Sequence, residues 1–173
     1  MLGSETLIYM VLLVFPAAMA LAAAIDLVSM TIPNRISLVL VGAFFVAAVL
    51  VGLPLETIAL HLLVGMLTLI VTFTLFAFNT IGGGDAKLLP AATLWLGLAP
   101  LSEFLIYTGL LGGLLSIALV LYRAILPPTF LIGQDWALRL HQKTCGVPYG
   151  LAIGGAALIV FPSTVWFKAV AAL

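Results

Sequence analysis

The stretch Ile81-Gly82-Gly83-Gly84-Asp85-Ala86-Lys87 interrupts a chain that is otherwise almost entirely apolar. Residues 57–84 contain no Asp, Glu, Lys or Arg, and three glycines then lead directly to Asp85 and, two residues later, to Lys87. A carboxylate at the edge of hydrocarbon is unfavourable unless it is hydrated, paired or protonated, so it marks a functional site by default. Glycine adds backbone freedom and lets a second chain approach closely. We therefore expect the rest of the chain to position Asp85.

The composition is that of an integral membrane protein. Of the 173 residues, 65% are hydrophobic and 7% are charged, whereas soluble domains carry about 25% charged residues. The formal net charge is zero, so nothing suggests nucleic-acid binding. The single cysteine, Cys145, excludes an internal disulfide and a cysteine-based zinc site, and we expect no metal or other cofactor.

The uncharged runs predict an all-α, polytopic bundle of six transmembrane helices, in a single domain that covers residues 1–173. About 20 apolar residues cross a bilayer as a helix. The first run could imitate a secretory signal, but it begins with Glu5 in place of a basic region, so we expect it to be retained. The predicted spans are residues 6–25, 36–53, 57–78, 84–98, 104–122 and 147–167.

The fourth of these spans is the weakest prediction. Few uncharged residues remain between Asp85 and the turn at Pro100, whereas the preceding uncharged run is longer than one span needs. We therefore expect residues 79–84 to lie at the membrane boundary as irregular backbone, which is tolerated only beside protein or a water-filled cavity. This places Asp85 in a partly buried, wet pocket.

The basic residues predict the orientation. With six spans, one side of the membrane carries a single basic residue, Lys168, and three acidic residues, Glu5, Glu56 and Glu103. Because Lys and Arg are enriched in cytoplasmic loops, we expect the opposite side to face the cytoplasm and both termini to lie outside it. The basic residues on this predicted cytoplasmic side are Arg35, Lys87, Arg123, Arg139 and Lys143.

Two aspartates share the predicted cytoplasmic boundary. Asp26 ends the first span and Asp85 follows the third, so two crossings return the chain to the same face. Two carboxylates in one pocket cannot both ionise easily and therefore share a proton. The ionised member can take a proton from water while the protonated member donates to a scissile carbonyl, which suits amide hydrolysis without a metal.

Other interpretations of these aspartates stay open at this point. In the first, both are interfacial residues that only accept hydrogen bonds from helix ends. A small transporter or channel could also use Asp85, because glycine-broken helices bind ions beside carboxylates. A third possibility is a non-catalytic assembly protein.

Three motifs resemble those of the type IV prepilin peptidases, polytopic aspartic proteases with a Gly-x-Gly-Asp motif. They are Gly82-Gly83-Gly84-Asp85-Ala86-Lys87-Leu88, Asp26 followed by Ile32-Pro33-Asn34, and Val147-Pro148-Tyr149-Gly150. The resemblance implies that Asp26 and Asp85 are the catalytic pair in a bacterial cytoplasmic membrane. The implied substrate is a prepilin or pseudopilin, cut after a Gly at the cytoplasmic end of its hydrophobic segment. The implied partners are this prepilin or pseudopilin and membrane lipid.

The small size resembles the short family members that serve tight-adherence (Flp) pili. Longer members also methylate the new amino terminus and carry a cytoplasmic extension with paired Cys-x-x-Cys, whereas this sequence has one cysteine, so methylation is not expected. The presenilin and signal-peptide-peptidase group shares Gly-x-Gly-Asp, but its Pro-Ala-Leu and Tyr-Asp motifs are not found here.

We further predict that Gly82, Gly83 and Gly84 bind the substrate, because an unwound backbone beside Asp85 needs room and hydrogen bonds. Lys87 is a further candidate for substrate binding, with two alternatives: it keeps Asp85 ionised, or it anchors the chain on the cytoplasmic side.

Among the remaining polar residues, Arg123, Arg139 and Lys143 are expected to contact lipid headgroups. We expect Asp135 to pair with Arg139 if their segment is helical, and His61 to be a hydrogen-bonded core residue.

Overall fold

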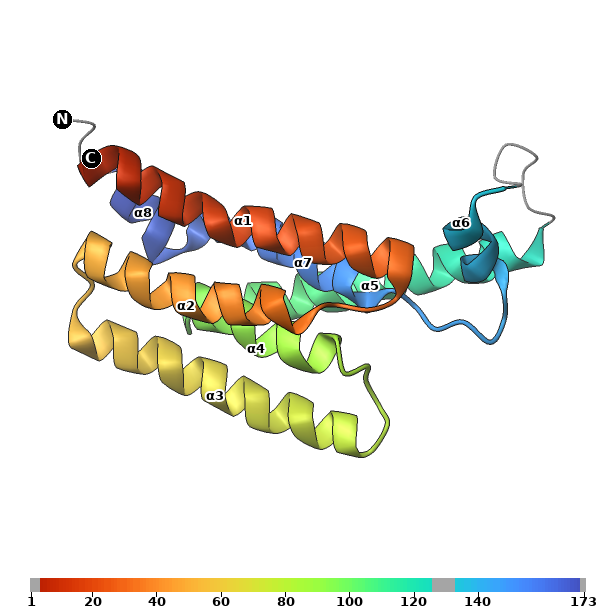
Figure 1. Cartoon of the computed structure of the whole chain (residues 1–173). Helices are drawn as coiled ribbons and strands as arrows, with labels where there is room; N and C mark the ends of the chain where they lie inside the picture. Colours follow the sequence, from red (N-terminus) through yellow and green to blue (C-terminus); the bar gives the residue numbers. More distant parts are fainter. Residues whose placement is uncertain (1–3, 126–132, 172–173) are drawn as a thin grey trace.

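The computed structural model describes residues 4–125 and 133–171, and every regular element in this part of the chain is a helix (Figure 1). Four of the helices are long: α1 (Ser4–Ser29), α2 (Asn34–Val51), α3 (Leu55–Ala77) and α5 (Leu101–Ala124). The shorter elements are α4 (Asp85–Leu96), α6 (Asp135–His141), α7 (Tyr149–Val160), the 3-10 turn η2 (Phe161–Ser163) and α8 (Val165–Ala171).

The four long helices are also the four that are long and apolar enough to cross a membrane, which supports an integral membrane protein. The predicted count of six spans is not confirmed. The predicted span 84–98 corresponds to α4, which has 12 residues, and the predicted span 147–167 covers α7, also of 12 residues, together with η2 and the beginning of α8. A helix of that length rises about 18 Å, whereas the hydrocarbon core is about 30 Å thick. Residues 79–84, which were expected to be irregular backbone, lie between α3 and α4 and belong to no regular helix; their position at the membrane boundary stays a prediction.

The short helices α4 and α7 form the centre of the bundle. Helix α4 packs against α3 and α2, α7 packs against α1 and α5, and the two short helices contact each other. Most side chains of α4 and α7 are buried, whereas the outer faces of the long helices expose apolar side chains. This is the pattern expected of long helices that face lipid around a protein-filled interior.

One end of the bundle is filled by aromatic side chains. Trp95 and Trp166 are completely buried, and their ring centroids lie 5.0 Å apart. Both indole N–H groups are satisfied, because Trp166 donates to the Trp95 carbonyl (2.6 Å) and Trp95 donates to the Leu40 carbonyl (2.8 Å). Phe44 packs against both tryptophans. Trp166 also lines a small cavity of about 150 Å³ between α1, η2 and α8 at this end.

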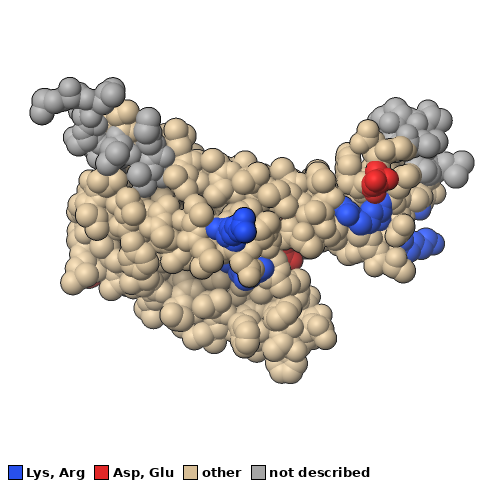
Figure 2. All heavy atoms as spheres, viewed as in Figure 1, with Lys and Arg blue, Asp and Glu red and all other residues tan. Residues whose placement is uncertain are grey.

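The opposite end collects the ends of α1, α3 and α5 and the beginnings of α2, α4 and α7 (Figure 1). Helix α1 ends where Met30 adopts φ 56°, and the turn after α3 contains Asn79 with φ 56°, both in the left-handed region that ends helices. In Figure 2, the visible Lys and Arg side chains lie over the middle of the bundle and at its α6 end. None is visible over the end that carries the α2–α3 turn.

Candidate active site

Helices α1 and α4 bring the two aspartates to one cavity at this end. Asp26 lies one turn before the end of α1, and Asp85 is the first residue of α4. The cavity has a volume of about 640 Å³. It is lined by Asp26, Met30, Thr80, Ile81, Gly82, Gly83, Gly84, Asp85, Leu89, Gly146, Val147 and Tyr149.

Asp26 is held by the beginning of α7. Its side chain is 6% exposed, and its Oδ2 accepts a 2.7 Å hydrogen bond from the backbone N–H of Gly150. A Cβ at Gly150 would lie 2.8 Å from this oxygen and 2.8 Å from Cδ1 of Ile32. Only glycine therefore fits there without a shift of its neighbours, and α1 meets the first turn of α7 through this contact.

Asp85 is half-buried and lies outside the four candidate spans. Burial and, to a lesser extent, the negative charge of Asp26 together raise the pKa of Asp85 to about 6. A hydrogen bond from the Gly82 backbone acts in the opposite direction on the same pKa. The two carboxyl groups are thus electrostatically coupled, and the cavity favours a state in which one of them holds a proton.

The three glycines before Asp85 are needed for close contacts, not for unusual backbone angles, because none of them has a positive φ. A Cβ at Gly82 would lie 3.2 Å from Asp85 Oδ2, one at Gly83 would lie 3.1 Å from the Phe76 ring, and one at Gly84 would lie 3.2 Å from Ile32. Each glycine therefore lets a different neighbour approach the loop. All three line the cavity, as a substrate-binding role requires.

A contact from α3 supports the first turn of α4. Pro90 has no N–H, so it cannot donate to the carbonyl of Ala86 four residues earlier. The hydroxyl of Thr72, on α3, donates to that carbonyl instead at 3.0 Å. Thr72 is 3% exposed. This role was not predicted, although a Pro inside a helix signals a carbonyl that needs another partner.

Ile32 and Tyr149 are two further residues at the site for which the sequence suggested no role. Ile32 is 4% exposed and lies against the positions where Gly84 and Gly150 lack a side chain. Tyr149 lines the cavity, and its phenol occupies the space that a Cβ at Gly112 would fill, 2.2 Å from Oη. Both belong to motifs that sequence analysis had singled out.

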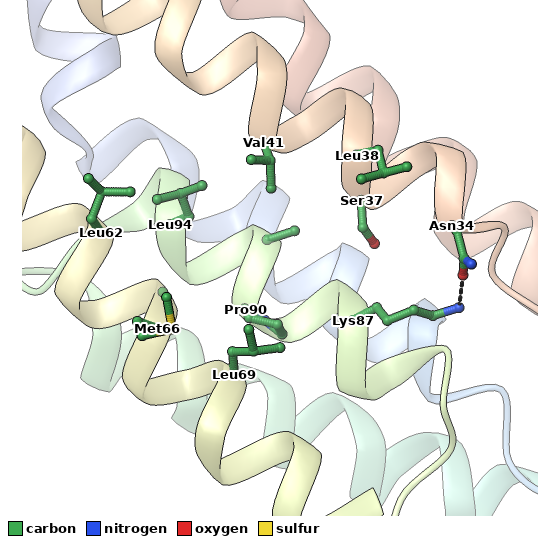
Figure 3. Close-up of a pocket in the computed structure, with 12 residues that line it drawn as sticks. Asn34, Ser37, Leu38, Val41, Leu62, Met66, Leu69, Lys87, Pro90 and Leu94 are labelled. Atoms are coloured by element: carbon green, nitrogen blue, oxygen red, sulfur yellow. Dashed lines mark hydrogen bonds between the residues drawn. The ribbon is translucent and has the colours of Figure 1, made fainter.

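Lys87 lies on a different face of α4 from Asp85. It lines a second cavity of about 450 Å³ between α2, α3 and α4 (Figure 3). Its ammonium group donates to the Ile32 carbonyl at 3.2 Å and to Oδ1 of Asn34. The structure thus brings together Asp26, Asp85 and the glycines but places Lys87 apart from them. A direct role of Lys87 in substrate binding stays a prediction.

Arg123 organises the segment that leads into α7. Its guanidinium group donates to the carbonyls of Leu140 (2.8 Å), Cys145 (2.9 Å) and Gly146 (3.0 Å). Because Gly146 lines the cavity, Arg123 supports the cavity wall, which goes beyond the headgroup contact expected from sequence.

Two other polar expectations are also resolved. The sequence predicted that Arg139 pairs with Asp135. In the structure, Arg139 donates to the Val28 carbonyl, and this contact links α6 to the end of α1. His61 is a hydrogen-bonded core residue as predicted, since its Nδ1 lies 2.7 Å from the Leu94 carbonyl and its ring is 4% exposed. Within the described residues, no cluster of His, Cys, Asp and Glu could hold a metal ion.

Comparison with known proteins adds one finding. A model of the type IV leader peptidase family matches residues 13–117, more than half of the chain and a range that includes both Asp26 and Asp85. No curated protein and no solved structure matches the chain.

Proposed function

The chain belongs to the type IV leader peptidase family, and from that premise we propose that Asp26 and Asp85 cleave a prepilin or pseudopilin at the cytoplasmic boundary of the membrane. Membership implies a peptidase of the aspartic type and a prepilin-type substrate. The observation that carries the proposal is the shared cavity, in which the charge of Asp26 raises the pKa of Asp85.

The two carboxyl groups divide the chemistry. Asp85 holds the shared proton and donates it to the scissile carbonyl oxygen, because its pKa, raised to about 6, lets it keep a proton at a higher pH than an ordinary aspartate does. Asp26 is the base that takes a proton from the attacking water, and the Gly150 N–H holds its carboxylate in place. Attack forms the C–O bond and leaves the protonated carbonyl oxygen as a hydroxyl. When the C–N bond then breaks, that hydroxyl returns its proton to Asp85 and the leaving nitrogen takes the proton that Asp26 received.

The Gly82–Gly84 loop provides space for the substrate backbone. A helical segment has satisfied amides and hidden carbonyls, so the substrate must unwind at the bond to be cut. The loop lines the cavity beside Asp85, and its lack of side chains suits an extended backbone. We propose that the cut follows a Gly at the cytoplasmic end of the substrate's hydrophobic segment, and that the substrate is of the Flp type.

Orientation follows from the charges at the site end. Five basic residues lie near the helix ends there: Arg35, Lys87, Arg123, Arg139 and Lys143. At the other end, Glu56 lies in the first turn of α3 and Glu103 in the first turn of α5. We propose that the site faces the cytoplasm, that α4 and α7 complete six crossings, and that both termini lie outside. Residues 1–3 and 172–173 are outside the described residues. Reporters fused after Gly52 or Pro100 should then report outside, and those fused after Arg123 or Lys143 should report cytoplasm.

The transporter alternative is less well supported. A transport path needs access from both sides of the membrane to a binding site near its middle. The end of the bundle opposite the aspartates is filled by Trp95, Trp166 and Phe44, each with no exposed surface. The site cavity therefore serves chemistry at one face better than passage through the bundle.

Co-expression with a candidate Flp-type prepilin tests the proposal. Mass spectrometry and N-terminal sequencing of the substrate should show removal of its leader by the wild type. Asp26→Asn and Asp85→Asn should each abolish removal, whereas Asp135→Asn, at an exposed aspartate of α6, should process normally. Cleavage by either active-site variant at near the wild-type rate would refute the paired mechanism, provided that all variants are inserted at equal levels.

A further inference from the structure

The second cavity is a groove with a polar end and an apolar remainder (Figure 3). Asn34, Ser37 and Lys87 form the polar end. The remainder is formed by apolar side chains of three helices, which include Val41 on α2, Met66 on α3 and Leu94 on α4. Lys87 is the only charged side chain among the described residues that line it.

The polar end has unused hydrogen-bond donors. An ammonium group has three donor protons, and Lys87 uses two of them on the Ile32 carbonyl and Asn34 Oδ1. The hydroxyl of Ser37 is buried and has no hydrogen-bond partner among the described residues. In Figure 3, this hydroxyl and the Lys87 side chain both lie on the side of the groove between α2 and α4. A cation with neighbouring donors is suited to an anionic, phosphate-like group.

The direction of the groove matches that of a lipid in the bilayer. Its polar end lies at the first turns of α2 and α4, at the end of the bundle where the basic residues gather. From Asn34 to Val41 and from Lys87 to Leu94, the lining runs for two turns of helix, or about 10 Å, towards the interior of the membrane. Leu38 and Met66 are 69% and 57% exposed, so the groove is open along the lipid-facing surface.

The size of the groove and its position argue against the substrate as the occupant. Ten residues of helix, about 10 Å wide and 15 Å long, occupy roughly 1,200 Å³, whereas the groove has a volume of about 450 Å³. Helix α4 also separates the groove from the aspartates, because Leu89 lines the site cavity while Pro90 and Ala91 line the groove. A substrate with its scissile bond beside Asp85 would have to pass around the beginning of α4 to reach it.

We propose that this groove binds an anionic phospholipid, with one acyl chain between α2, α3 and α4 and the phosphate on Lys87 and Ser37. The lipid would join the first turn of α4, which carries Asp85, to α2. The site is independent of peptide cleavage, so its test measures bound lipid and not proteolysis.

The test uses the full chain in nanodiscs that contain equal amounts of phosphatidylglycerol and phosphatidylcholine. After transfer to detergent, native mass spectrometry should show one retained phospholipid, predominantly phosphatidylglycerol. Lys87→Gln should lower the preference for phosphatidylglycerol about fivefold, because one basic residue near the membrane surface contributes about that factor. Equal retention of the two lipids by the wild type would overturn the proposal.

A matched pair of variants tests the acyl-chain part of the groove. Val41→Trp fills the groove and should remove the retained lipid, whereas Val46→Trp adds the same side chain at a 52% exposed position of α2 that does not line it. Equal lipid retention by the two folded variants would contradict the proposal. Displacement of phosphatidylglycerol by a synthetic prepilin segment would also contradict it and would assign the groove to the substrate. If Val41→Trp fails to fold, the Lys87→Gln result decides.

Discussion

The backbone N–H of Gly150 donates a 2.7 Å hydrogen bond to Oδ2 of Asp26, a residue 124 positions earlier in the chain. This contact fixes the carboxylate of one helix by the first turn of another, while Asp85 begins a third helix at the same cavity. The distance between the two aspartates in the folded protein therefore depends on how α1, α4 and α7 pack. Substitution of small residues at these contacts should therefore lower activity although both aspartates are retained.

Gly150→Ala should lower the rate of leader removal about 100-fold, because misplacement of a catalytic group by about 1 Å has an effect of that size. The new Cβ would lie 2.8 Å from Asp26 Oδ2 and must displace it. The control is Gly42→Ala, since a Cβ at Gly42 meets no atom within 4 Å. Cleavage rates and melting temperatures of both purified variants provide the measurement, and wild-type activity in Gly150→Ala would show that Asp26 needs no such contact.

The pH dependence of kcat/KM should be bell-shaped. At acid pH both carboxyl groups are protonated and no base remains, whereas at higher pH both are ionised and no acid remains. Since the pKa of Asp85 is raised to about 6, the upper limb should begin near that pH in the free enzyme. Peptide cleavage in detergent across the range in which the protein stays folded provides the profile. A flat profile would contradict a shared proton.

Asp85→Asn should stabilise the protein at neutral pH while it abolishes cleavage. Because the folded-state pKa of Asp85 is raised from 3.8 to about 6, its contribution to stability is greatest below the unfolded pKa and is lost as pH rises through about 6. At pH 7.5 the variant should therefore melt about 5 °C higher, for an effect of about 2 kcal/mol. At pH 4 the difference should nearly vanish. Asp135→Asn serves as the control, and a lower melting temperature for Asp85→Asn at pH 7.5 would contradict the prediction.

Gly84→Ala should reduce stability and cleavage together. Its φ of −65° is open to alanine, but the new Cβ would lie 3.2 Å from Ile32 Cγ1. The effect should therefore depend on Ile32, and Ile32→Val should partly relieve it, because valine lacks the Cδ1 atom that would lie 3.3 Å from the new Cβ. A double-mutant cycle of melting temperatures and rates measures this coupling. If the two substitutions are strictly additive, the glycine serves some purpose other than contact with Ile32.

The helix boundaries were predictable where a proline in the sequence marks the beginning of a helix. Pro33, Pro54 and Pro100 each directly precede a helix, so the predicted spans 36–53, 57–78 and 104–122 agree with α2, α3 and α5 within a few residues. The predicted shared face of Asp26 and Asp85 agrees with their common cavity. The family was also predicted from its motifs and is confirmed by the match over residues 13–117.

Contacts between distant parts of the chain were not predictable in the same way. Gly150 was singled out as part of a motif, but nothing in the local pattern indicates its hydrogen bond to Asp26. Lys87 was grouped with Asp85 because it is near in sequence, yet residues two apart on a helix do not face the same way. The sequence left unclear where α4 begins, and that starting point decides which residues share a face with Asp85.

The buried aromatic cluster at the far end of the bundle has an energetic implication for the cell. Because Trp95, Trp166 and Phe44 have no exposed surface there, we expect water and protons to reach the aspartates from their own side of the membrane only. If so, the proposed cleavage moves no proton across the bilayer and no charge through the electric field. Leader removal should therefore proceed at the same rate in energised and de-energised membranes, as long as the pH on the side of the aspartates is unchanged.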